Sequence, residues 1–533
     1  MPTRSRVFRS VMLTILGVGL LLSAWALRPA QSATPPSTET PTSRTDKPTL
    51  QPRYGGTFKV LAAGGPTVVG YIPELSGQNM LSTFHMFEPL VDIGADLEFK
   101  PTRLVTDLEI APDGKSVKMT LRKGVKFHDG TDFNAQAAKW NLEGSIKVKY
   151  VGMETWTTVD VLDEYTIRLN LKQRDFSVVT NLSKSGSWQA SPTAFAKNGL
   201  EWARKNPVGT GPFKFVSFER DASLKARRFD SYWRKGLPYL DGFDFYFIAD
   251  PMVRQAALEA GEGHALDRPT PKQASDLKAK GFEVIGPWPT FMFLLGPDSA
   301  NPGSPFAERR VRQALEHAID RDAIAKALGY GFFTGMTQPV PPDYAAGYNP
   351  DKKGRKYDPK MARQLLAEAG YPQGFKTKIY ADAAQANKDI VVALQDYFGK
   401  SGIDVALELV PRAKYFDLRV NGWHNGLIYI TMGLDFTFTN TLARTVSVDN
   451  LTYKSMLRPP GWKELIDAAV ASPNVKTYIE RTKKAVGALY EDATYLPLFG
   501  SLPYVVIHKS VHDTGWCTVN LSYTTPEKTW MEK

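Results

Sequence analysis

The stretch RKGVKFHDGTDFNAQAAKWNLE, residues 122–143, places His128 beside Asp129, with a second aspartate and an asparagine shortly after. Such side chains bind metal ions or act as acid–base pairs when several of them converge. His128 and Asp129 are consecutive, however, and on a strand they point to opposite faces. Asp129-Gly130 is a turn pair, and Asn134 stands at an N-cap position directly before a helical run. We therefore predict a strand, a turn and a capped helix, which is a scaffold and not a catalytic site.

The elements that position this stretch mix strands and helices along the whole chain, without a repeat of 20–50 residues. Period-two alternation predicts strands at 55–63, 116–121, 125–127 and 164–172. Helical spacing of apolar residues predicts helices at 134–146, 252–260, 308–328, 359–369, 385–401 and 475–490. The pattern indicates an α/β or α+β protein with more than one lobe.

Composition and charge exclude several classes of protein. The 533 residues are 43% hydrophobic, which is enough for a large core, and four of the charges behind the net +11 lie in the first 33 residues. No Lys/Arg block follows, so we predict no nucleic-acid partner. The single cysteine, Cys517, excludes an intramolecular disulfide and a multi-cysteine metal site. The seven histidines are scattered along the chain, so we predict no metal and no cofactor.

The N-terminus has the pattern of an export signal. Three arginines precede the apolar run at 11–27, and small residues follow it. We predict that residues 1–33 are a signal peptide, cleaved after Ala26 or after Ala33, with an uncleaved membrane anchor as the alternative. Residues 34–53 are rich in Pro, Ser and Thr and are predicted to be a disordered linker. The expected location is the periplasm.

Several motifs resemble, in order, the segments of the family 5 extracytoplasmic solute-binding proteins, the oligopeptide, dipeptide and nickel receptors of ABC importers. The motifs are LRKGVKFHDGTDFNAQAAKWNLE (121–143), NPVGTGPFKF (206–215), ALEAGEGHAL (257–266), RRVRQALEHAIDRDAIAKAL (309–328) and YDPKMARQLLAEAGYPQGF (357–375). The resemblance covers nearly the whole chain after the linker. It implies a two-lobed, periplasmic-binding-protein-like α/β fold of the type II, cluster C class, with an extra inserted domain and a hinge between the lobes.

The same resemblance sets the expected domain boundaries. Lobe one would contain domain I, built from 54–99, 206–288 and 501–533, together with an inserted domain II at 100–205. Lobe two would be domain III at 289–500. The segment around His128 would then be scaffold, away from the ligand cleft.

The resemblance also implies a ligand site in the stretch LIYITMGLDFTFTN, 427–440. Asp435 stands where relatives carry the carboxylate that pairs with a peptide ammonium. A lone carboxylate in this apolar run is costly to bury without a cation, and a ligand ammonium would supply one. The alternative is a turn aspartate, or one that pairs with a protein arginine such as Arg412 or Arg444.

Departures from the family pattern concern the walls of this site. Met432 replaces the usual tryptophan three residues before the aspartate, so peptide specificity is in doubt while ligand capture is not. Further ligand-binding residues are predicted by position, namely Gly433, Phe436, Phe499, Trp423, Tyr71 and Arg412. Arg412, with Lys414 and Arg419, forms either a carboxylate-binding group or a solvated face. Trp423 and His424, with His85, raise the alternative of a bound metal chelate.

The predicted function is an exported, monomeric solute receptor that delivers a peptide or peptide-like solute to an ABC permease and its ATPase in the inner membrane. The alternatives are the same receptor for a sugar, an opine or a metal chelate, a membrane-tethered sensor or holding chaperone, or an exported hydrolase. Against a hydrolase, the sequence has no Gly-x-Ser-x-Gly elbow, no His-Glu-x-x-His pair and no Ser-x-x-Lys accompanied by its partner motifs. Cys517 near His512 and Asp513 is its remaining candidate, and we predict no enzyme activity.

Overall fold

The computed structural model describes residues 50–75, 78–94, 96–286, 291–342, 344, 346–383, 386–447, 452–501, 505–515 and 526–532. The described residues from Pro52 onward form one compact unit. The predicted signal peptide, nearly all of the predicted linker, and Cys517 lie outside the described residues. Among the helices that are described, none is both long and apolar enough to cross a membrane.

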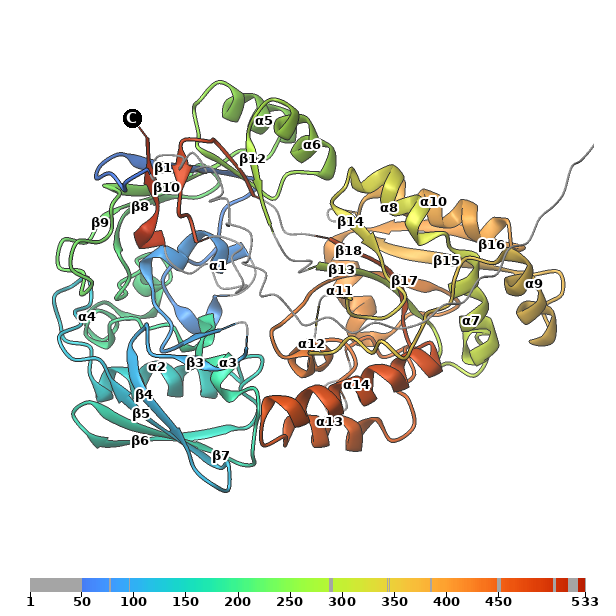
Figure 1. The fold of residues 1–533 in the computed structure, drawn as a ribbon, viewed down its shortest axis with the longest axis horizontal. Coiled ribbons are helices and arrows are strands. Elements are labelled where there is room, and N and C mark those ends of the chain that lie inside the picture. The colour runs from blue at the N-terminus through green and yellow to red at the C-terminus, as the bar shows by residue number, and fades with distance from the viewer. Residues whose placement is uncertain are drawn as a thin grey trace, which may run out of the picture. The chain divides into compact units, whose positions relative to one another are not determined.

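A seven-stranded sheet is assembled from three distant parts of the chain (Figure 1). Its order is β12 (Glu283–Ile285), β19 (Val505–Ile507), β11 (Ala265–Asp267), β1 (Thr57–Ala62), β10 (Gly242–Phe247), β9 (Ser223–Arg228) and β8 (Phe213–Glu219). Strand β1 pairs in parallel with β10 and β11, whereas β19 pairs antiparallel with β11 and β12. Buried aromatic residues from β1, β8 and β10 fill the adjoining core.

A six-stranded sheet forms the second large element of the fold. Its order is β14 (Phe333–Gly335), β18 (Leu496–Ser501), β13 (Phe291–Pro297), β17 (Leu427–Gly433), β15 (Phe375–Asp382) and β16 (Ile403–Val410). Successive residues of β17 alternate between two cores, as a strand buried on both faces requires. Ile428, Ile430 and Met432 belong to one core, and Leu427 and Tyr429 belong to the other.

A four-stranded antiparallel sheet has the order β4 (Val105–Ile110), β5 (Ser116–Leu121), β7 (Thr166–Leu171) and β6 (Trp156–Asp163). Helix α2 (Ala135–Lys147) packs against β6 and β7. We call the seven- and four-stranded sheets with their helices lobe one, and the six-stranded sheet with its helices lobe two. The expected two-lobed α/β fold is confirmed.

The remaining elements cover and connect these sheets. In lobe one they are α1 (Gln78–Thr83), β2 (Asp92–Ile93), β3 (Phe99–Lys100), α3 (Val178–Leu182), α4 (Pro192–Ala203), α5 (Pro251–Glu259), α6 (Pro271–Ala279), β20 (Val511–His512) and β21 (Trp530–Met531). In lobe two they are α7 (Arg309–Ala318), α8 (Arg321–Gly329), α9 (Pro359–Glu368), α10 (Lys388–Gly399), α11 (Arg412–Asn421), α12 (Phe438–Ala443), α13 (Trp462–Val470) and α14 (Val475–Asp492). Short 3-10 helices are Ile72–Glu74, Phe84–Met86, Ser185–Ser187, Pro305–Ala307 and Pro526–Lys528.

The stretch around His128 is the scaffold that the sequence predicts. Gly130 has φ +86° in the turn, and the Asn134 side chain accepts a 3.1 Å hydrogen bond from the backbone N–H of Ala137 at the start of α2. The buried His128 contacts the carbonyl of Gly211 through Nε2 at 2.9 Å. Asp129 points elsewhere, because its oxygens accept hydrogen bonds from the side chains of Thr131 and Ser191. The polar residues of this stretch therefore make hydrogen bonds that hold the turn and the start of α2 in place.

Two predicted elements were wrong in detail. The helix predicted at 308–328 is two helices, because Ile319 is extended (φ −108°, ψ 121°) and the Asp320 side chain caps α8 by accepting from the backbone N–H of Ala323. A capping aspartate competes with the continuous helix for that N–H group. The strand predicted at 125–127 is an isolated bridge between Lys126 and Asp132, within a tight hairpin.

The lobes contact each other through the chain segment that contains α3. The backbone N–H of Phe176 donates to the carbonyl of Val470 at 2.8 Å, and its ring stacks on Tyr478 with a 4.2 Å centroid distance. Asn440 donates to the side-chain oxygen of Asn181 at 2.8 Å. Helix α3 of lobe one therefore lies against α12 and α14 of lobe two.

Candidate ligand site between the lobes

Asp435 lies two residues after the end of β17, where the chain leaves the six-stranded sheet and continues toward α12. The residue is 8% exposed. Its backbone N–H donates to Thr441 Oγ1 at 2.9 Å, and Tyr344 donates its hydroxyl hydrogen to the backbone carbonyls of Asp435 and Phe436. The backbone around the carboxylate is thus held from both sides by lobe two.

The carboxylate itself is paired across the lobes. Lys184, which follows α3 in lobe one, places Nζ 2.5 Å from Asp435 Oδ1, and Arg444 Nη2 lies 3.9 Å from Oδ2. Burial alone would raise the pKa of the Asp435 carboxyl, but Lys184 and Arg444 outweigh that effect and hold its pKa below the usual value. Burial lowers the pKa of the Lys184 ammonium, with Asp435 acting in the opposite direction. The carboxylate is therefore ionised at neutral pH.

Two cavities meet at this ion pair. One of about 230 Å³ is walled by apolar side chains of both lobes, including Phe87, Trp188 and Phe436. The other, of about 470 Å³, is lined by residues such as Tyr150 and Asn440. The side chains of Lys184, Asp435 and Arg444 line both cavities, as do Met80 and Ser185. An apolar space with a few convergent charged groups is the usual form of a small-molecule site.

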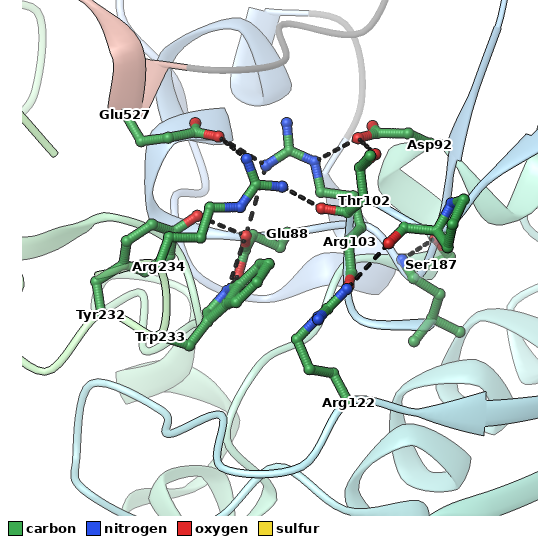
Figure 2. Close-up of polar contacts among 12 residues, drawn as sticks. Glu88, Asp92, Thr102, Arg103, Arg122, Ser187, Tyr232, Trp233, Arg234 and Glu527 are labelled. Atoms are coloured by element: carbon green, nitrogen blue, oxygen red, sulfur yellow. Dashed lines mark hydrogen bonds and ion pairs between the residues drawn. The ribbon is translucent and has the colours of Figure 1, made fainter. Parts of the chain in front are cut away.

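A second charged cluster lines the smaller cavity away from this pair (Figure 2). Arg103, which is 2% exposed, donates to Asp92 at 2.9 Å and contacts Glu527 at 3.3 Å and Glu88 at 3.5 Å. Arg234 reaches the same oxygen of Glu527 at 2.8 Å. The buried Glu88 also accepts hydrogen bonds from Tyr232 and Trp233. Burial raises the pKa of Glu88, despite these donors.

The structure brings three of the sequence-predicted site residues together. Phe436 is buried and lines the 230 Å³ cavity beside Asp435. Gly433 ends β17, and its carbonyl accepts a 3.1 Å hydrogen bond from Arg444. Met432 is one residue further from the cavities and packs in the core of lobe two. The roles of all three toward a ligand stay predictions.

The other predicted residues lie apart from this pair and line neither of the two cavities. Phe499 is fully buried and stacks on Phe333. Trp423 is 1% exposed and donates from Nε1 to the carbonyl of Gly426. Arg412 is exposed and contacts Asp382 at 3.3 Å, so of the two arginines considered as partners of Asp435 it is Arg444 that lies near it.

Tyr71 lines a separate cavity of about 310 Å³ together with Trp140 and Phe195, on which its ring stacks. All lining residues of that cavity fall within 70–208, so both walls belong to lobe one. Closure of lobe two on lobe one would not enclose a solute there. We therefore place the candidate ligand site at Asp435.

The structure also places the residues on which the metal-chelate and hydrolase alternatives depend. Among the residues that the structure describes, no group of three or more His, Cys, Asp or Glu is placed to hold a metal ion. His85, one member of the metal-chelate hypothesis, is buried among Phe84, Phe213 and Phe243. His512 contacts Glu532 at 2.8 Å and stacks on Trp530. Cys517 lies outside the described part of the chain.

Sequence reasoning missed Lys184, the residue closest to the predicted carboxylate. The segment NLSKSGSW around it carries a single charge and no periodic pattern, and 251 positions separate Lys184 from Asp435. Arg103 and Glu527, which are 424 positions apart, were missed for the same reason. The sequence did contain one signal for Lys184, a single charge in an otherwise uncharged segment. Such a charge indicates that an oppositely charged partner exists, but it does not identify that partner.

Comparisons with known proteins agree with this fold. Residues 101–449 match the model of the bacterial extracellular solute-binding proteins, family 5 (middle part). A glutathione-binding protein, GsiB of Shigella flexneri serotype 5b, is 33% identical over 296 residues, which cover 54% of this chain and 57% of the relative. The chain thus spans little more than half the length of that curated relative.

Solved structures match over more of the chain. The periplasmic binding protein DppA of Helicobacter pylori, in complex with the peptide STSA, has a TM-score of 0.77 at 26% identity and covers 90% of this chain and 99% of its own. NikA of Brucella suis, in complex with Fe(III)-EDTA, has a TM-score of 0.78 at 23% identity, with 89% and 100% covered, and shows the fold alone.

These matches, together with a two-lobed fold whose lobes meet at a charged cavity, define the class of protein. The chain belongs to family 5 of the bacterial extracellular solute-binding proteins.

Proposed function

We propose that this protein is the extracytoplasmic receptor of an ABC importer, which captures a peptide or peptide-like solute between its two lobes and delivers it to the permease and ATPase. The observation that carries the proposal is the 230 Å³ cavity, whose walls come from both lobes and meet at the Lys184–Asp435 pair. The names of the relatives support the solute class, since GsiB is glutathione-binding and DppA holds a peptide.

The mechanism is domain closure. A solute in this cavity touches Trp188 of lobe one and Phe436 of lobe two at once, which is possible in the closed arrangement and not when the lobes are apart. Binding therefore shifts the population toward the closed form by the difference in affinity between the two forms. The predicted domain boundaries follow residues 288 and 500, and the nearby residues 287–290 and 502–504 lie outside the described part of the chain.

Binding without turnover is part of the proposal, as are a periplasmic location, a monomeric state and action without cofactor. The family description supports binding as the activity, and the similarity to DppA, a periplasmic binding protein, supports the location. Two cavities, of about 230 and 470 Å³, adjoin the Lys184–Asp435 pair, and we keep a non-peptide solute as the second candidate.

Native mass spectrometry of the mature protein, purified from its own periplasm without denaturant, tests the proposal. We expect a retained solute, either a ladder of peptide masses or one discrete mass. Small-angle scattering should show compaction when that solute is returned to the stripped protein. A protein that retains nothing, captures nothing from a peptide library and never compacts would overturn the proposal.

A further inference from the structure

The charges at the ion pair do not balance. Two cations, Lys184 at 2.5 Å and Arg444 at 3.9 Å, lie against the single carboxylate of Asp435, and all three side chains line both cavities. In relatives the corresponding carboxylate is expected to pair with a ligand ammonium. Here the protein supplies that ammonium itself, from the opposite lobe.

The two cations have hydrogen-bond donors to spare. An ammonium has three donors and a guanidinium has five. Lys184 donates to Asp435 and, at 3.1 Å, to Asn181. Arg444 donates to the carbonyl of Gly433, and 40% of its side chain is exposed. Within the described part of the chain, these contacts leave donors of both cations directed at no protein acceptor.

Neighbouring acids do not cancel this excess at the cavity surface. Asp175 acts electrostatically on Lys184, but it lines neither cavity and its carboxylate accepts from Thr155 at 2.6 Å and from the N–H of Ser177 at 2.8 Å. Glu88 and Glu527 line the smaller cavity, but both are shared with Arg103, and Glu74, which lines the larger cavity, is paired with Arg204. The wall formed by Lys184 and Arg444 therefore presents positive charge to a solute.

We propose that this wall is a carboxylate subsite, in which Lys184 and Arg444 donate hydrogen bonds to a carboxylate of the solute, and that Asp435 positions the two cations instead of holding a ligand ammonium. The inference rests on the proposed function and names the chemical class of its solute. Charge-assisted bonds from an ammonium and a guanidinium to a carboxylate are among the strongest that a pocket offers. Lys184 is on this view the specificity-determining residue, since it joins the site when the lobes meet.

The test compares solutes that differ in one charge. An equimolar tripeptide library is offered to the stripped protein as free peptides, as C-terminal amides and as N-acetyl peptides, and capture is measured by native mass spectrometry and titration calorimetry. We expect amides to bind at least 10-fold more weakly than free peptides, and N-acetyl peptides to bind within about threefold of free peptides. The opposite order, with amides captured and N-acetyl peptides lost, would overturn the inference.

Variants separate this role from a structural one. Lys184→Met should lower affinity for free peptides about 10- to 100-fold and leave the affinity for amides unchanged, so that the preference for a carboxylate disappears. Lys184→Arg should restore part of that preference. The control is Lys147→Met, which removes an ammonium that lines the separate 310 Å³ cavity and should keep the full preference. An equal loss for free and amidated peptides would assign Lys184 to structure alone.

If the protein captures no peptide from the library, a second experiment tests the carboxylate subsite. The solute that copurifies with the protein is then methyl-esterified and returned to the stripped protein, with glutathione and its esters as a defined second probe. Loss of binding on esterification supports the carboxylate subsite, and unchanged binding overturns it. Absence of any retained or captured solute would instead refute the proposed function.

Discussion

Residues of two charged clusters line the smaller cavity, and the two clusters differ in how completely their charges are paired. Arg103 is buried among three carboxylates, and Glu88 has further donors in Tyr232 and Trp233 (Figure 2). Lys184 and Arg444 share one carboxylate and remain partly exposed. A buried charge is costly unless opposite charges and hydrogen bonds compensate it. A charged side chain that binds a ligand instead keeps a hydrogen-bond donor without a protein acceptor. The completeness of pairing thus separates the structural cluster from the binding cluster.

Removal of Arg103 should produce the largest effect. Arg103→Met leaves Glu88, Asp92 and Glu527 in a buried site with fewer cations, and we expect a loss of about 3–5 kcal/mol in the free energy of unfolding. Urea unfolding followed by circular dichroism measures it. Arg168→Met, which breaks the exposed pair with Asp160, is the control and should cost below about 1 kcal/mol. A loss for Arg103→Met as small as the control would contradict the structural role.

A pH comparison tests the contrast between an acid that is ion-paired with cations, Asp435, and one that accepts hydrogen bonds without an ion pair, Asp175. Burial raises the pKa of Asp175 to about 6, so its ionisation destabilises the fold progressively as pH rises from about 4 to 6. Asp175→Asn should therefore leave stability unchanged near pH 4 and increase it by up to about 3 kcal/mol at pH 7.5.

Asp435→Asn should act with the opposite sign. Because Lys184 and Arg444 lower the pKa of Asp435, its charge stabilises the fold above the ordinary pKa of the carboxyl and this contribution is lost as pH falls. Thermal melts of both variants from pH 4 to 7.5 measure the two differences. Equal signs at pH 7.5 would show that the two carboxylates are not distinguished by their cations.

The Lys184–Asp435 pair itself should contribute less than the Arg103 cluster. Lys184→Met is expected to cost about 1–2 kcal/mol of unfolding free energy, because Arg444 stays near the carboxylate and 26% of the Lys184 side chain is exposed. A double-mutant cycle of Lys184→Met with Asp435→Asn measures the coupling between the two residues. A coupling of zero would mean that the two charges do not interact in solution.

The smallest effect is expected at Arg412. Its pair with Asp382 is half exposed on the arginine side, and its side chain lines neither cavity. Arg412→Gln should change the free energy of unfolding by less than about 0.5 kcal/mol and leave solute affinity within about twofold. A 10-fold loss of affinity in calorimetry would instead support the prediction of Arg412 as a ligand-binding residue.

Local chemistry made much of the fold predictable from the sequence. The strand at 116–121 has the predicted bounds, and α2 begins after the predicted cap at Asn134, because alternation and capping are decided by neighbouring residues. The break at Ile319 was not predictable in the same way, since the apolar spacing continues through it. There the Asp320 cap prevailed over the helical pattern.

The candidate site was predictable in part. The sequence predicts a buried carboxylate at Asp435, and a buried carboxylate requires a cation as its partner. Which cation meets it depends on how α3 packs against α12, and that contact joins side chains 251 residues apart. Pairs that are so distant in the sequence do not affect the local spacing of residues, so Lys184 could be identified only from the folded structure.

The position of β19 has a consequence for the order in which the chain folds. Residues 505–507 lie in the interior of the seven-stranded sheet, between β11 and β12, although they follow both strands by more than 200 positions. A chain growing from its N-terminus therefore has two unpaired strand edges in lobe one until residue 507 has emerged. Such late, distant pairing makes the completion of this sheet slow.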